Sequence, residues 1–192
     1  MTINDNDKWM QKLIGGQVEI VPFYKSTHIV DTVNVLLNVC KTDPSYPPLQ
    51  DAKRTPESFA DWLIREPVLS RWVATVGGEV IGHIAIANPH LYIMNFLNSI
   101  DYDITTSDKL GEIIKFFVHP AARQNGVGES LLAHALISLR NMQLQPVLAV
   151  VSDSRSARRL YAHIGMKQLG YFEGIHGLNF VFTDEKAKFL NR

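Results

Sequence analysis

The 192-residue sequence predicts an α/β fold, an α+β mixed sheet with helices on its faces. Strand-like and helix-like apolar patterns follow one another in the order β, α, α, ββ, β, α, β, α, ββ. Two consecutive glycines, Gly77-Gly78, separate two strand patterns and predict a tight hairpin. The continuous apolar run at 147–151 is typical of a strand that is buried on both faces. Together these features favour a sheet covered by helices.

Each expected element in the first half is bounded by residues that favour turns or helix caps. Pro22 ends a strand, and Ser26 or Thr27 is the expected N-cap of a helix that must end near Asp43-Pro44. Thr55-Pro56-Glu57 predicts a second helix, because it combines a capping hydroxyl, a proline at the first helical position and an acid in the first turn. The elements expected here are strand 18–21, these two helices, and hairpin strands 71–76 and 79–87.

In the second half, each of two helical patterns follows an apolar strand. Residues 88–111 form a long mixed connection, in which 91–97 fits either a short helix or a lid, and periodicity does not separate the two. Gly165 is the expected C′ residue of the last helix. The elements expected here are strand 113–118, helix 127–142, strand 147–151, a helix carrying 157–164, and strands 169–172 and 178–183.

Composition argues for one domain over 1–192, with its core at about 17–184. Nineteen basic and nineteen acidic residues give a net charge of +0, which disfavours nucleic-acid and membrane-surface partners. The N-terminal stretch lacks a secretory signal pattern, and no apolar run is long enough for a membrane span. The single cysteine, Cys40, cannot form an internal disulfide, so we expect a cytoplasmic location. The seven histidines lack the paired spacing of metal ligands, so no metal is expected.

The most informative stretch is HPAARQNGVGESLL, residues 119–132, between a predicted strand and a predicted helix. A helix N-terminus leaves its first amides unpaired and carries partial positive charge. Gly126 and Gly128 remove side chains there, which lets an anion such as pyrophosphate approach, although a simple tight turn is the alternative. A nucleotide P-loop fits less well, because no lysine follows Gly128. A dinucleotide-binding turn also fits less well, because Leu131 stands where a third glycine is needed.

Two motifs resemble those of the GCN5-related N-acetyltransferase (GNAT) superfamily. Val118-x-Pro120-x-x-Arg123-x-x-Gly126-Val127-Gly128-x-x-Leu131-Leu132 resembles motif A, which wraps the pyrophosphate of coenzyme A. Ser154-x-x-Ala157-x-x-Leu160-Tyr161-x-x-x-Gly165-Met166 resembles a second family motif, with Ser154 and Met166 in place of Asn and Phe; a serine there can still cap the helix. The resemblance covers nearly the whole chain. It implies a GNAT-like fold, whose central, mostly antiparallel sheet has helices on both faces and a splayed strand pair that holds the cofactor.

The resemblance also implies an enzyme, an acetyl-CoA-dependent N-acetyltransferase that acts on a primary amine by direct attack on the thioester. Tyr161 would protonate the departing thiolate, although it also completes a core stripe. Glu112 would be the general base, or else a solvated strand-end carboxylate. Cys40 shows no sign of a reactive thiol, so an acyl-cysteine route is not expected. The residues implied in cofactor binding are Phe116, Phe117, Val118, Arg123, Gln124, Asn125, Gly126, Val127, Gly128, Glu129, Ser154, Ala157 and Tyr161.

The sequence leaves the acceptor open between a small-molecule amine and a peptide or protein amine. Arg155, Arg158 and Arg159 are either a solvated helix face or contacts to the 3′-phosphate of coenzyme A. A non-catalytic acyl-CoA-binding (sensor or regulatory) domain and a binder of another nucleotide are the alternative functions. A homodimer is expected only because dimers are common in the family. The residues expected to border the acceptor are Tyr46, Trp62, Tyr92, Phe96, Asp101, Tyr102, Asp103, Glu173 and His176.

Overall fold

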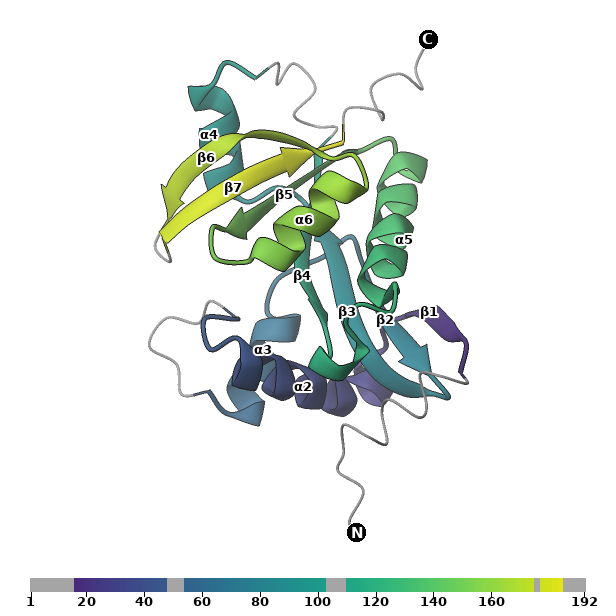
Figure 1. Ribbon diagram of the computed structural model, residues 1–192. Helices are drawn as coiled ribbons and strands as arrows, with labels where there is room; N and C mark the ends of the chain where they lie inside the picture. Colours follow the sequence, from purple (N-terminus) through teal and green to yellow (C-terminus); the bar gives the residue numbers. More distant parts are fainter. Residues whose placement is uncertain (1–15, 48–53, 103–109, 175–176, 185–192) are drawn as a thin grey trace. The chain divides into compact units, whose positions relative to one another are not determined.

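The computed structural model describes residues 16–47, 54–102, 110–174 and 177–184 (Figure 1). The predicted element order is confirmed, and the stretch that the sequence left open, 91–97, is helical. The elements are β1 (Val18–Pro22), α2 (Lys25–Thr42), α3 (Pro56–Ile64), β2 (Ser70–Val76), β3 (Glu79–Ala87), α4 (Leu91–Ser99), β4 (Leu110–Val118), the 3-10 turn η2 (Pro120–Ala122), α5 (Val127–Asn141), β5 (Gln145–Val151), α6 (Arg155–His163), β6 (Lys167–Gly174) and β7 (Gly177–Thr183). No helix in these described ranges is long and apolar enough to cross a membrane.

The seven strands form one mixed sheet in the order β1-β2-β3-β4-β5-β7-β6. The pairs β1–β2, β5–β7 and β6–β7 are antiparallel, whereas β4 and β5 are parallel. The register of β4 with β5 covers three pairs, from Leu110↔Gln145 to Glu112↔Val147. Both strands continue beyond these pairs, β4 to Val118 and β5 to its own end. This short register is the pairing expected of a splayed strand pair, and the predicted mixed α/β fold is confirmed.

The chain divides into two compact units, and strands β3 and β4 each pass from one unit to the other. One unit contains Met1–Ala85 and Lys115–His134, and the other contains Ile86–Ile114 and Ala135–Arg192. The expectation of a single domain is not tested by this division and stays a prediction.

In the first unit, helices cover both faces of the sheet. Val73 of β2 belongs to a core cluster with α2 and α3, while its neighbour Trp72 contacts His134 of α5 with ring centroids 4.9 Å apart. Because successive side chains of a strand point to opposite faces, α2 and α3 lie on one face and the start of α5 on the other. The buried members of the cluster are Val33, Val35, Leu36, Val39, Phe59, Leu63, Val73, Val80 and Phe117.

In the second unit, α4 and α6 cover opposite faces of β7. Val181 packs in a cluster with residues of α4, β4 and β5. Its neighbours Phe180 and Phe182 contact Arg158 and Tyr161 of α6. The alternation of side chains along β7 therefore separates the two helices. The buried members of this cluster are Ile93, Phe96, Leu97, Leu110, Val147 and Val181.

Two predicted helix starts have different outcomes. At α3 the capping prediction is confirmed, because Thr55 Oγ1 accepts a hydrogen bond from Ser58 N–H at 3.3 Å and Ser58 Oγ accepts one from Thr55 N–H at 3.0 Å. At α2 the expectation of Ser26 or Thr27 as N-cap was wrong. The N-cap is Tyr24, whose N–H donates to Nδ1 of a residue one turn ahead, His28, at 3.0 Å. The His28 imidazole accepts the hydrogen bond of the Tyr24 amide, so the helix begins at Lys25, before Ser26 and Thr27.

The hairpin turn between β2 and β3 is confirmed. Gly77 and Gly78 have φ of 57° and 81°, the left-handed values that a two-residue turn of this kind needs.

Candidate functional site

The turn from β4 into α5 presents consecutive backbone amides beside open space. Gln124 and Gly126 have φ of 64° and 74°. Ser130 N–H donates to Gly126 O at 2.9 Å, which is an i→i−4 bond, so the amides of residues 127–129 precede it. A Cβ added at Gly126 would meet no atom within 4 Å. Glycine is therefore needed here for its backbone conformation, and the space beside it fits an anionic group such as a pyrophosphate.

Side chains contribute little to this cradle, which we define as residues 124–129. Val127 is buried in the core, and Glu129 is exposed. Asn125 Nδ2 donates to Arg123 O at 2.9 Å, and Arg123 Nε donates to Val118 O at 3.3 Å. The donors available to an anion are thus mainly backbone amides, and the Arg123 guanidinium is held at the end of β4.

The last residues of β4 carry a buried polar arrangement that the sequence did not reveal. Phe117 stacks on His83 with ring centroids 5.3 Å apart, so the Phe117 side chain belongs to the core and only its backbone can serve a cofactor. Lys115 has φ of 51° in mid-strand, and its Nζ lies 3.0 Å from Glu66 Oε2. His83 Nδ1 donates to Lys115 O at 2.7 Å. Burial lowers the pKa of Lys115, and it lowers the pKa of His83 to about 3.

Glu112 is the buried member of a polar cluster with the start of α4, in which Tyr92 is exposed. Its Oε2 accepts hydrogen bonds from His90 N–H and His90 Nδ1, each at 2.7 Å, and its Oε1 accepts one from Tyr92 O–H at 2.7 Å. The His90 and Tyr92 rings stack at 5.2 Å and 13°, and Tyr92 contacts Phe172 of β6 at 5.7 Å. The Glu112 side chain is only 2% exposed, so the alternative of a solvated strand-end carboxylate was wrong.

Sequence reasoning missed the partnership of Glu112 with His90 and Tyr92. The three residues lie 20 and 22 positions apart, and no spacing rule links such a pair. His90 was one of seven histidines without metal-ligand spacing, and Tyr92 was one of several aromatics expected near the acceptor. The available signal was the placement of both just before and within the 91–97 stretch, which leads back to the strand that carries Glu112.

Tyr161 lies on the face of α6 that packs on β7. It is buried and contacts Phe182 with ring centroids 5.4 Å apart. Burial raises the pKa of its hydroxyl above the usual value of about 10, so the hydroxyl stays protonated near neutral pH. Ala157 lies one turn earlier on the same helix.

Ser154 is the N-cap residue of α6, but its side chain makes no capping hydrogen bond, so that expectation was wrong. The physical reason is its backbone conformation. With φ of −75° and ψ of 61°, it lies outside the extended region from which a capping side chain usually reaches the helix amides.

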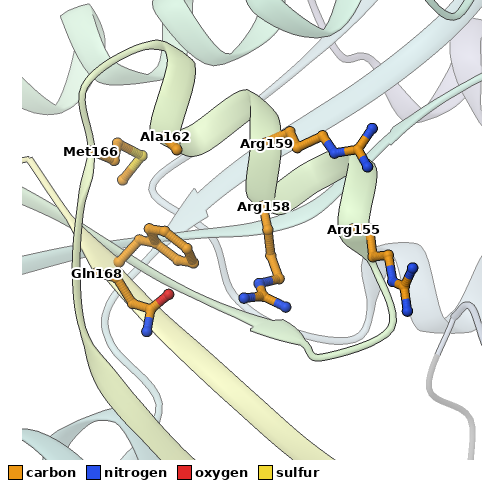
Figure 2. A pocket seen from close by; sticks show the side chains of 7 residues that line it. Arg155, Arg158, Arg159, Ala162, Met166 and Gln168 are labelled. Carbon is orange, nitrogen blue, oxygen red and sulfur yellow. The ribbon is translucent and has the colours of Figure 1, made fainter.

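A cavity of about 440 Å³ opens beside α6 within the second unit, and Figure 2 shows its lining side chains. Arg158 is held in place, because its Cζ lies 3.9 Å from the Phe180 ring centroid and its Nη1 donates to Ser152 O at 3.3 Å. Three of the lining residues are arginines, and none is acidic. Both expectations for these arginines, a solvated helix face and a contact to the 3′-phosphate, stay predictions. The lining residues are Arg155, Arg158, Arg159, Ala162, Met166, Gln168 and Phe182.

The aromatic residues expected around the acceptor mostly build the core. In the first unit, Tyr46 contacts Trp62 at 5.8 Å and packs against the α2–α3 cluster. In the second, Phe96 is buried and Tyr102 Oη accepts a hydrogen bond from Gln145 Nε2 at 2.7 Å. Asp103 and His176 lie outside the described residues. Within the described ranges, no group of three or more His, Cys, Asp or Glu side chains could hold a metal ion.

The fold and the cradle together define an acetyltransferase of the GNAT type. A family model described as the acetyltransferase (GNAT) family matches residues 35–166, more than half of the chain. This protein therefore belongs to the GNAT acetyltransferase family. No curated protein matches the sequence.

Several solved structures share the fold at low sequence identity. An acetyltransferase from Streptococcus agalactiae 2603 is 20% identical, with a TM-score of 0.61, covering 87% of this chain and 98% of that one. The Salmonella typhimurium protein yncA, solved with its cofactor acetyl-CoA, is 15% identical, with a TM-score of 0.61 and coverage of 86% and 91%. Arabidopsis thaliana NAA60 in complex with acetyl-CoA is 16% identical, with a TM-score of 0.61 and coverage of 88% and 98%. At these sequence identities the similarity shows a shared fold.

Proposed function

We propose that this protein is an acetyl-CoA-dependent N-acetyltransferase that transfers an acetyl group to a primary amine by direct attack on the thioester. The observation that carries the proposal is the left-handed turn at Gly126, at the N-terminus of α5, where an added Cβ would meet no atom within 4 Å. Family membership supports the same ligand, as do the two acetyl-CoA complexes among the similar structures. When bound, acetyl-CoA supplies an acetyl group already activated as a thioester.

The cofactor's pyrophosphate would be held by the amides of residues 124–129, where the helix N-terminus adds partial positive charge. Arg123 would add a guanidinium beside these amides. Backbone groups of Phe116 and Val118 would bind the pantetheine amides, because the register of β4 with β5 stops at Glu112. The family resemblance also implies cofactor contacts for Ser154 and Ala157, at the start of α6.

Acyl transfer requires the amine to lose a proton and the leaving sulfur to be stabilised. The amine nitrogen forms the new C–N bond, the C–S bond breaks with its electron pair on sulfur, and the thiolate finally takes a proton. Tyr161 would stabilise the leaving sulfur. Because burial raises its pKa, the hydroxyl would act chiefly as a hydrogen-bond donor to the thiolate. Glu112, together with the residues that donate hydrogen bonds to it, would supply the base that removes a proton from the amine.

The proposal is tested by thiol release from acetyl-CoA against polyamines, aminoglycosides, free amino acids, and peptides with free N-termini or lysines. Turnover of one amine class is the expected result and also names the acceptor. Binding of acetyl-CoA without turnover of any amine would overturn it in favour of a non-catalytic acyl-CoA-binding domain. A thermal-shift comparison that favours ATP or NAD over coenzyme A would instead indicate a binder of another nucleotide.

A further inference from the structure

The cavity beside α6 has an apolar floor and a cationic rim. Met166 and Phe182 line it and are only 5% and 3% exposed. Of its three arginines, which project from α6 in Figure 2, Arg155 and Arg159 are exposed and Arg158 is half-buried. The volume of about 440 Å³ is in the range of clefts that hold a small organic molecule. All of the lining residues belong to the second compact unit.

The positive charges of the rim lie where a helix disfavours them. Arg155 is the first residue of α6, and the first turn contains no acidic residue. A cation at a helix N-terminus is unfavourable, and like charges at i+3 and i+4, such as Arg158 and Arg159, repel the first one. Asp153, the nearest acid along the chain, accepts a hydrogen bond from Ser152 Oγ at 3.3 Å. Within the described ranges, no carboxylate forms an ion pair with the three arginines, so a bound anion would relieve their repulsion.

Arg158 is held in a fixed position before any ligand arrives. Its Cζ lies 3.9 Å from the centroid of the Phe180 ring, and its Nη1 donates to Ser152 O at 3.3 Å. Its Nε is buried without a hydrogen-bond partner, so this guanidinium has more donors than the described residues satisfy. A guanidinium that is already held loses little freedom on binding, and its planar shape matches the oxygens of a phosphate or carboxylate.

Two of the arginines lie on a different side of α6 from the residues that the family resemblance assigns to the cofactor. Those residues are Ala157 and Tyr161, and Tyr161 packs on β7. Arg155 and Arg159 each lie two residues from Ala157, which is about 160° around a helix of about 3.6 residues per turn. A group bound by these arginines is therefore distinct from the part of the cofactor that Ala157 and Tyr161 would contact.

From these observations we propose that the cavity beside α6 is a second binding site, for a small phosphate monoester that carries an apolar or aromatic group. The phosphate, with a charge of about −2 near neutral pH, would bind the three arginines, which a singly charged carboxylate would neutralise less well. The apolar group would lie against Met166 and Phe182. The site uses side chains of the second unit alone, so the proposal does not depend on the acetyltransferase function.

The test follows the methyl NMR signal of Met166, assigned with Met166→Leu, while phenyl phosphate is added as the probe. The titration is run with and without saturating acetyl-CoA, because a phosphate could also bind the cradle. The Met166 signal should shift and reach saturation. Inorganic phosphate lacks the ring and benzyl alcohol lacks the charge, so each should bind at least about tenfold more weakly. If phenyl phosphate gives no saturable shift, the arginines are a solvated helix face and the proposal is overturned.

Variants of the rim test which side chains hold the phosphate. Arg155→Gln, Arg158→Gln and Arg159→Gln should each lower the affinity for phenyl phosphate about tenfold, because each removes a charge-assisted hydrogen bond. Arg65→Gln is the matched control, since it makes the same change of charge at an exposed arginine after α3, and its affinity should stay within twofold. If Arg158→Gln does not fold, the two exposed positions carry the test. Full affinity in both of those variants, or an equal loss in Arg65→Gln, would contradict the proposal.

The cofactor's own 3′-phosphate is the competing occupant, and acetyl-CoA and its 3′-dephospho form distinguish it. Phenyl phosphate should bind with the same affinity when either is saturating. Displacement by acetyl-CoA but not by the dephospho form would mean that the cavity holds the 3′-phosphate, and displacement by both would mean that the two sites overlap; either result overturns the proposal. If acetyl-CoA does not bind at all, the acetyltransferase proposal fails, whereas the Met166 titration still decides this one.

Discussion

The cradle and the Glu112 cluster are built in opposite ways. The cradle uses six consecutive residues, 124–129, two of which are glycines, so its donors are mainly backbone amides. The cluster uses three side chains from positions 90, 92 and 112, which only the packing of α4 against β4 brings within 2.7 Å. The cradle is open beside Gly126, whereas Glu112 is almost fully buried. The first is a local conformation and the second a tertiary contact.

This difference predicts different consequences of substitution. A change in the cradle blocks a ligand but removes few contacts within the protein. A change in the cluster removes hydrogen bonds to the buried Glu112 carboxylate, so it should affect stability as well as chemistry. The experiments below test this contrast.

The largest effect is expected for Gly126→Glu, which places a carboxylate where the pyrophosphate would bind. Acetyl-CoA affinity should fall more than 100-fold by calorimetry, because like charges meet at the helix N-terminus. Gly77→Glu is the matched control, since Gly77 also has a positive φ and open space around its Cβ. It should carry a similar backbone strain but leave affinity unchanged. If Gly126→Glu binds acetyl-CoA as tightly as the wild type, the cradle does not hold the pyrophosphate.

The next effect is expected on stability, from Glu112→Ala. The His90 amide, the His90 imidazole and the Tyr92 hydroxyl would all lose their hydrogen bond to the buried carboxylate, and unfolding free energy should drop by about 2 kcal/mol. Urea denaturation measures the loss. Glu129→Ala, at an exposed position of the cradle, should change stability by less than about 0.5 kcal/mol. Equal losses in both variants would contradict the contrast between the two regions.

Tyr161→Phe should have a smaller effect, seen in the rate of the reaction. Removing the hydroxyl should lower kcat about tenfold, because one donor to the leaving sulfur is lost, while acetyl-CoA affinity stays within twofold. Single-turnover thiol release would separate the chemical step from product release. An unchanged kcat would mean that Tyr161 only packs on α6. Equal losses in kcat and in acetyl-CoA affinity would mean that it binds the cofactor.

The last effect is a change in pH dependence, and it concerns the end of β4 that leads into the cradle. His83 has a pKa of about 3 in the folded protein, against about 6.5 when exposed. The unfolded chain therefore binds more protons between these values, so stability falls as pH drops from about 6.5 towards 3, by at most about 1.4 kcal/mol per unit. His83→Asn, whose amide can still donate to Lys115 O, should flatten this dependence in urea titrations at pH 7.5 and 5.

His163→Gln is the control for that experiment, because His163 is exposed. Its pH dependence should match the wild type. The same slope in all three proteins would mean that His83 does not contribute to acid sensitivity.

The predictions from sequence succeeded where the physical cause is local. Gly77-Gly78 predicted a hairpin because a two-residue turn needs left-handed backbone. Thr55-Pro56 predicted a helix start, and Gly126 predicted an open helix N-terminus, for similarly local reasons. Predictions of a cap failed at Ser154, and at α2, where His28 satisfied the amide of Tyr24 instead. Several side chains near a helix start can accept a hydrogen bond from the same backbone amide, and the sequence alone does not show which of them does.

By itself, the sequence of this protein determined the order of its strands and helices, the glycine turn of the cradle and the stripe that places Tyr161 on α6. These depend on backbone preferences and on apolar periodicity within a few residues. Only the tertiary structure decided that Glu112 is buried and that His90 and Tyr92 donate to it. Such contacts depend on how a helix packs on a strand some twenty residues away, and many side chains could occupy that place with the same local pattern.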